Sequence, residues 1–164
     1  MDFPLFLEFS RRGEMTQKDA FEESFALVDL AEKVGVDSVW LAEYHFNVDR
    51  SVLSAPITVA SAIAARTERM RIGLAVHILP LGNPVRIAEE VATLDHISHG
   101  RLEFGIGRGT FPNVHEGYGV PFHESRSRFD EYLEVIVKAW TNDTFSFQGE
   151  HFSCTDVGIA PHPY

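Results

Sequence analysis

Arg101-Leu-Glu-Phe-Gly-Ile-Gly-Arg-Gly109 is the stretch that decides the fold, because it joins a short apolar strand to a glycine-rich loop. The loop is not a dinucleotide-binding fingerprint, since Thr110 stands at the position where G-x-G-x-x-G requires its third glycine. That fingerprint also belongs on the first strand-to-helix turn, whereas this loop follows the fourth strand of the pattern. The stretch therefore argues against nicotinamide binding and indicates a ligand loop at the carboxyl end of a parallel strand.

Working outward, strand and helix patterns alternate along the whole chain. Alternating or continuous apolar runs predict strands over residues 3–9, 38–42, 71–79 and 101–106. Apolar side chains at helical spacing, with start and stop residues, predict helices over residues 16–35, 54–66, 83–100 and 125–140. Residues 145–152 predict a short β-hairpin that turns at Gly149. This alternation is typical of a parallel sheet joined by right-handed crossovers.

Capping residues mark the predicted helix ends. Thr16 and Asp19 have the spacing of a capping box, and Gly35 is placed to end the first helix. Ser54 is expected to cap the second helix and Asn83 the third, each just before a proline-containing first turn.

Two architectures fit this pattern: an open, doubly wound sheet, or half of a TIM-type (β/α)8 barrel. Residues 43–53 and 107–123 form long loops at the carboxyl ends of strands. Residues 35–37 and 99–100, which lead into strands, are short. Long loops on one face indicate an active-site face, but the pattern alone leaves both architectures open.

Composition limits the partners. The formal net charge is −10, which argues against nucleic acid or an anionic membrane surface as a main partner. Cys154 is the single cysteine, so no internal disulfide is possible. The first residues lack a basic leader and no apolar run approaches the ~20 residues of a membrane span, so a cytoplasmic location is expected.

Two pairs of residues are candidates for chemistry at this face. Tyr44 and His45 follow the second strand, where either can act as acid, base or hydrogen-bond donor, although a histidine there can also simply pack in the mouth. Arg108 and Arg126 lie at the two ends of one loop, and guanidinium groups suit a cofactor phosphate. The alternative is that each arginine pairs with a nearby carboxylate such as Asp130.

No metal site is expected. His96 and His99 lie three residues apart on a predicted helix, with Asp95 adjacent, and this spacing can supply two ligands. A third ligand is not evident, and histidine is favoured at a helix carboxyl end for electrostatic reasons.

Several motifs in a fixed order carry a family resemblance. They are Val39-Trp-Leu-Ala-Glu-Tyr-His-Phe46, Arg71-Ile-Gly-Leu-Ala75, Leu79-Pro80, Asn83-Pro-Val-Arg-Ile-Ala-Glu-Glu90, Leu94-Asp-His-Ile-Ser-His-Gly-Arg101 and Phe104-Gly-Ile-Gly-Arg-Gly109. In this order and spacing they resemble the bacterial luciferase-like monooxygenase family.

The resemblance implies a (β/α)8 barrel, of which residues 1–164 form one domain with the first four βα units and a short hairpin. It implies reduced FMN as cosubstrate, O2, a small organic substrate, a separate flavin reductase and a homo-oligomer. It assigns Arg108 and Arg126 to the flavin phosphate. It also places a non-prolyl cis peptide at Ala75-Val76 against the flavin ring.

Two departures from the family pattern matter. Tyr44 stands where luciferases have their catalytic histidine, and a phenol is not a base at neutral pH unless its pKa shifts far. Gly107 replaces a reactive cysteine. A deazaflavin-dependent oxidoreductase and a non-catalytic, self-associating flavin-binding half-barrel therefore remain alternatives. Since family members are about twice this length, the 164 residues alone are expected to be an inactive fragment.

Overall fold

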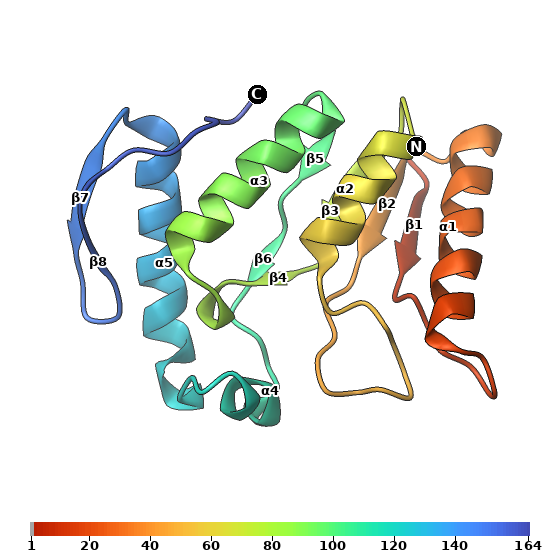
Figure 1. Cartoon of the computed structure of the whole chain (residues 1–164), viewed down its shortest axis with the longest axis horizontal. Helices are drawn as coiled ribbons and strands as arrows, with labels where there is room; N and C mark the ends of the chain where they lie inside the picture. Colours follow the sequence, from red (N-terminus) through yellow and green to blue (C-terminus); the bar gives the residue numbers. More distant parts are fainter. Residues whose placement is uncertain (1) are drawn as a thin grey trace. The chain divides into compact units, whose positions relative to one another are not determined.

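A computed structural model describes residues 2–164, which fall into two compact units (Figure 1). The first unit comprises the chain up to His77 together with Ile97–Gly105. The second comprises Ile78–His96 and Ile106–Tyr164. No helix among residues 2–164 combines the length and the apolar character that a membrane span needs.

The first unit contains a four-stranded parallel sheet. Its strands are β1 (Pro4–Leu7), β2 (Ser38–Leu41), β3 (Arg71–Leu74) and β5 (Leu102–Glu103). They are hydrogen-bonded in the order β1-β2-β3-β5, which is also their order along the chain. A doubly wound sheet reverses its strand order at a switch point, and this sheet shows no reversal.

The helices of this unit are α1 (Gln17–Val34) and α2 (Pro56–Arg66), seen beside the strands in Figure 1. Thr16 and Asp19 form the predicted capping box, and Gly35 ends α1 with a left-handed φ of 91°. The predicted cap at Ser54 is wrong, because the N-cap of α2 is Ala55, without a side-chain hydrogen bond. Pro56 opens this helix with a φ already fixed for it.

The apolar core of the first unit lies on the strands, on the helix faces that meet them and on a few residues of the adjoining loops. Its fully buried members include Phe9, Val28, Val39, Leu41, Leu53, Ile63, Met70, Ile72 and Leu74. Gly73 is needed in β3 because the Trp40 indole of the neighbouring strand occupies the space of a Cβ atom. Only glycine leaves room for this indole, although a glycine inside a strand ordinarily weakens strand pairing.

Two predicted strands are shorter than expected. β3 ends at Leu74, and residues 77–81 form β4 (His77–Ile78) and the 3-10 turn η1 (Leu79–Leu81). The fourth predicted strand divides into β5 and β6 (Ile106–Gly107), because the Gly105 N–H bonds back to the Glu103 carbonyl. An apolar run does not distinguish a strand from an irregular buried segment, so both strands were predicted to be longer than they are.

The second unit is mainly helical. It contains most of α3 (Pro84–Ser98), then α4 (Pro112–Gly117), the 3-10 turn η2 (Phe122–Glu124) and α5 (Ser125–Thr141), followed by β7 (Phe145–Gln148) and β8 (Ser153–Val157). Asn83 Oδ1 accepts hydrogen bonds from two N–H groups of α3, as predicted for its cap. The hairpin is confirmed, with β7 against α5 (Figure 1), although its second strand lies beyond residue 152. Helix α4 was missed because one turn and a half carries no periodic pattern.

Arg101 joins three segments of the first unit. Its guanidinium donates to the carbonyls of Ala64, Thr67 and Met70 at 2.9 Å each, and to the Thr67 hydroxyl at 2.8 Å. Its Nε donates to the Ser98 carbonyl at 2.7 Å. A planar, five-donor group satisfies the end of α2, the start of β3 and the turn before β5 together.

We predict that Arg101→Lys lowers the free energy of unfolding by about 3 kcal/mol, because an ammonium cannot reproduce the fork of donors. Urea unfolding followed by circular dichroism measures the change. Arg71→Lys is the matched control, since Arg71 pairs with Glu103 in an exposed ion pair. The control is expected to stay within about 0.5 kcal/mol of the parent. Equal effects of both substitutions would contradict the role of Arg101.

Candidate functional site

The two units each contain part of the predicted site. Tyr44 and His45 follow β2, and Ala75 and Val76 follow β3, all in the first unit. The bond between Ala75 and Val76 is cis, as the family resemblance implies. The Ala75 N–H donates to the Leu41 carbonyl at 2.7 Å, so this segment continues the sheet beyond the end of β3.

Tyr44 is held by an ionic network that sequence patterns did not reveal. Its hydroxyl donates to Glu8 Oε1 at 2.8 Å, and Arg50 binds the same carboxylate at 2.7 and 3.2 Å. The Arg50 guanidinium also lies over the Tyr44 ring, 4.5 Å from its centroid. Glu8 and Arg50 are distant in sequence. The only sequence signal for their contact was that both lie in loops that follow the carboxyl ends of neighbouring strands.

Titration in this network keeps the phenol protonated. Burial raises the pKa of Tyr44 above its ordinary value, and the hydrogen bond to the Glu8 carboxylate raises that pKa further. The hydrogen bond from Arg50 has the largest effect on the pKa of Glu8, and it lowers that pKa. Burial acts in the opposite direction, and the hydrogen bond from the Tyr44 hydroxyl again lowers the pKa, which ends below its ordinary value. Tyr44 is therefore a hydrogen-bond donor near neutral pH and not a base.

His45 belongs to a buried cluster around Glu43. His45 Nε2 donates to Glu43 Oε1 at 2.8 Å, and His77 Nδ1 lies 2.9 Å from Glu43 Oε2. The exposed fractions of the Glu43 and His45 side chains are 4% and 6%. Glu43 and His77 were not among the predicted site residues. The sequence signal for His77 was its position inside an otherwise apolar run, directly after Ala75-Val76.

Both predicted phosphate-binding arginines lie in the second unit, and their side chains have different partners. Arg108 Nη1 donates to Ser125 Oγ at 3.1 Å, which brings its guanidinium to the N-terminus of α5. Arg126 instead donates to Asp130 at 2.8 Å, one turn along α5, and its side chain is 74% exposed. The structure thus shows for Arg126 the carboxylate pairing that the sequence left open, because partners four residues apart meet on a helix surface.

The start of α5 is suited to an anion. No side chain caps its first turn, and the turn η2 runs directly into α5, because the Ser125 N–H donates to the Phe122 carbonyl. Glu124, which precedes the helix, is neutralised by Arg128 at 2.7 Å. The hydrogen bond from Arg128 lowers the pKa of Glu124. Arg108 and Ser125 therefore stand at a helix terminus with little opposing charge.

The glycines of the loop after β5 are explained by packing within the chain. A Cβ atom at Gly105 would collide with the Leu74 carbonyl. Gly109 has a left-handed φ of 76° and lies against the buried His115 ring. His115 Nε2 donates to the Arg108 carbonyl at 3.1 Å, so this packing fixes the backbone that carries Arg108. Burial lowers the pKa of His115, which favours the neutral ring.

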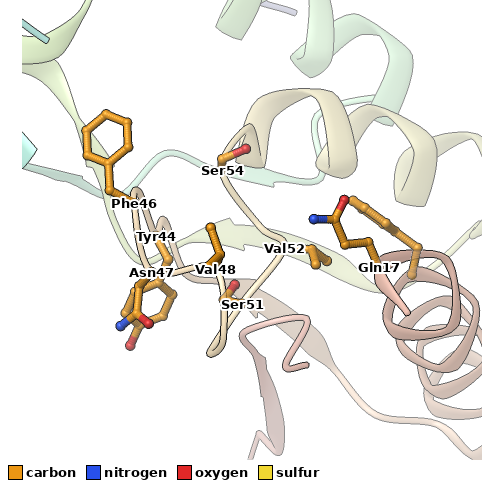
Figure 2. A pocket seen from close by; sticks show the side chains of 9 residues that line it. Gln17, Tyr44, Phe46, Asn47, Val48, Ser51, Val52 and Ser54 are labelled. Atoms are coloured by element: carbon orange, nitrogen blue, oxygen red, sulfur yellow. The ribbon is translucent and has the colours of Figure 1, made fainter. Parts of the chain in front are cut away.

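A cavity of about 370 Å³ opens beside Tyr44 in the first unit. Figure 2 shows its lining side chains, which come from the start of α1 and from the loop between β2 and α2. Phe21, Phe46 and Val52 supply apolar surface, while Gln17 and Ser54 add hydrogen-bonding groups. Within residues 2–164, no cluster of three or more histidine, cysteine or acidic side chains has the arrangement of a metal site.

Comparisons with known proteins agree on one family. The model of the luciferase-like monooxygenase family matches residues 1–164. The alkanal monooxygenase alpha chain of a Kryptophanaron alfredi symbiont is 29% identical over 164 residues, which are all of this chain and 46% of that protein. The chain thus spans about half the length of the curated relatives it matches.

Solved structures share the fold. Monooxygenase RslO1 from Streptomyces bottropensis superposes with a TM-score of 0.92 at 31% identity, over 99% of this chain and 50% of that one. A Pseudomonas putida type II Baeyer-Villiger monooxygenase, the oxygenating constituent of 3,6-diketocamphane monooxygenase in complex with FMN, gives 0.87 at 22% identity, over 94% and 43%. An F420-dependent secondary alcohol dehydrogenase gives 0.78 at 23%, over 99% and 49%. The chain belongs to the luciferase-like monooxygenase family.

Proposed function

We propose that this chain is the N-terminal half of an FMN-dependent monooxygenase, which uses reduced flavin and O2 to oxidise a small organic substrate. The observation that carries the proposal is the family match over residues 1–164, joined to an arginine and a serine at an uncapped helix N-terminus. We further propose a (β/α)8 barrel, of which residues 1–164 form part of one domain. The unreversed parallel order β1-β2-β3-β5 supports this, because consecutive strands are neighbours in such barrels.

The flavin phosphate is assigned to the Arg108 guanidinium and the Ser125 hydroxyl at the start of α5. Two kinds of donor, a charged guanidinium and a serine hydroxyl, already lie 3.1 Å apart there. The helix dipole adds a partial positive charge at the same place. Arg126 can join this site only by leaving Asp130, so we assign it a smaller share of the binding energy.

The flavin ring is assigned to the Ala75-Val76 segment, as the family resemblance implies. Val76 is 38% exposed there, which leaves apolar surface for a flat ring. When bound, reduced FMN would supply the electrons that activate O2. The chain's own contribution is to bind and orient the ring, to exclude water and to hold protons at defined atoms.

Tyr44 and His45 are the proposed catalytic pair. The Glu8 network keeps a proton on the Tyr44 hydroxyl, so Tyr44 would act by donating a hydrogen bond. His45 is oriented by the Glu43 carboxylate, an arrangement that fixes which ring nitrogen carries the proton. The cavity beside Tyr44 is the proposed substrate pocket, since about 370 Å³ lies within the range of small-molecule sites.

A separate flavin reductase is the proposed partner, and a homo-oligomer the proposed assembly. One structural neighbour is titled the oxygenating constituent of its monooxygenase, which fits an enzyme that takes reduced flavin from elsewhere.

A deazaflavin is the second candidate cofactor. The fold of this chain is shared with an F420-dependent alcohol dehydrogenase, and a phosphate site like that of Arg108 and Ser125 serves either flavin. Binding measured in parallel with FMN and with F420 separates the two.

We predict that Arg108→Ala weakens FMN binding by about 2 kcal/mol, roughly thirtyfold in Kd, because one charged hydrogen-bonding group is lost. Titration of the flavin fluorescence with purified protein measures the affinity. Arg86→Ala is the control, because Arg86 is exposed and pairs with Glu89 and Glu90 on its own helix. Unchanged affinity in both Arg108→Ala and Arg126→Ala would refute the phosphate assignment.

We also predict that Glu8→Gln lowers the pKa of Tyr44, since the carboxylate that disfavours a neighbouring phenolate is removed. Absorbance titration of tyrosinate, compared with Tyr44→Phe to identify the transition, reports this pKa. Glu103→Gln serves as the control for loss of an exposed acidic residue. If Tyr44 titrates at the same pH in Glu8→Gln and in the parent, Glu8 does not hold its proton.

A further inference from the structure

Three buried titratable side chains meet at the ends of β2 and β3. Glu43 lies between two imidazoles, with one carboxylate oxygen 2.8 Å from His45 Nε2 and the other 2.9 Å from His77 Nδ1. The exposed fraction of the His77 side chain is 16%. Burial by itself raises the pKa of Glu43, but the two imidazoles more than offset this, so that pKa lies below its ordinary value. The carboxylate is therefore charged, and it favours a proton on each nitrogen that faces it.

His77 differs from its neighbour in one respect. Its Nε2 is buried and has no hydrogen-bond partner among residues 2–164. Its Nδ1 lies 2.9 Å from Glu43 Oε2, but without the alignment of a good hydrogen bond. Buried polar atoms in proteins are nearly always paired, and an exception calls for a ligand or a chemical role.

The His77 ring is held in place by its surroundings. Its backbone N–H donates to the Gly105 carbonyl at 2.8 Å, and the Phe104 ring lies against the imidazole with centroids 6.1 Å apart. With the proton drawn to Nδ1 by Glu43, neutral His77 keeps a lone pair on Nε2. A carboxylate that orients an imidazole in this way also stabilises the imidazolium formed when Nε2 takes up a proton.

We propose that His77 is a proton-transferring contact of the bound flavin, with Glu43 as the residue that positions it. The inference rests on the proposed function, because His77 directly follows the Ala75-Val76 segment assigned to the flavin ring. With flavin bound, His77 Nε2 would accept a hydrogen bond from an N–H group of the ring and could take up its proton. The ring N–H bond would break as the Nε2–H bond formed, leaving imidazolium beside the Glu43 carboxylate. The reverse step would return the proton, and no electron would move.

FMN titration of the parent protein, observed by nitrogen NMR of the histidine side chains, tests this contact directly. Addition of FMN is expected to shift the Nε2 signal of His77 and to leave in place that of His99, an exposed residue before the amino end of β5. The signal is assigned in the parent protein from the proximity of the His77 ring to that of Phe104, and it should be missing in His77→Gln.

The variant supplies a second measurement. The complex of His77→Gln with FMN is expected to show an altered flavin absorbance spectrum and roughly tenfold weaker binding, because a glutamine amide cannot take up the proton. His99→Gln, the matched control, should keep the parent spectrum and affinity. Thermal melting shows whether His77→Gln is folded; if it is not, the NMR shift in the parent protein decides.

The outcomes separate the two proposals. If the parent binds FMN while the His77 signal stays in place, the inference is wrong and the proposed function stands. If the parent binds no FMN, the proposed function falls and the role of His77 falls with it.

Discussion

The parallel backbone ladder of the first unit is the constraint on which the other features depend. Once Leu7, Leu41 and Leu74 are held in register, the residues that follow them leave the sheet at one edge. This edge is where Glu8, Glu43 and the Ala75-Val76 segment emerge, each from a different strand. The polar networks are consequences of this register, because a slip of one residue would turn every side chain to the opposite face. Arg101 stabilises the other end of the same unit through backbone carbonyls, away from these networks.

The polar side chains at this edge form two groups, each centred on a carboxylate. Glu8 joins Tyr44 to Arg50, and Glu43 joins His45 to His77. In both groups a charged carboxylate decides where the protons lie: on the phenol in the first, and on the facing imidazole nitrogens in the second. A tyrosine in place of the histidine of luciferases is therefore not an isolated change, since its hydroxyl already has a carboxylate partner. The arrangement suits hydrogen-bond donation by Tyr44 and proton transfer by histidine.

Local features of the fold were predictable from the sequence, and contacts between distant segments were not. The Thr16–Asp19 capping box and the Asn83 cap depend on residues within one turn, and both are confirmed. Ser54 failed as a cap because the proline-opened helix begins one residue later, at a position that propensity does not resolve. The site shows the same division. The family motif indicated Tyr44, His45 and the cis bond at Ala75-Val76. The contacts of Glu8 with Tyr44 and of His77 with Glu43 join residues that are distant in sequence, so the sequence could not show them.

Arg108 and Ser125 at the start of α5 are the proposed site of the flavin phosphate. A crystal structure of the protein with FMN tests this assignment most directly. We expect the phosphate within hydrogen-bond distance of the Arg108 guanidinium and the Ser125 hydroxyl. A well-ordered FMN whose phosphate touches neither residue would contradict it.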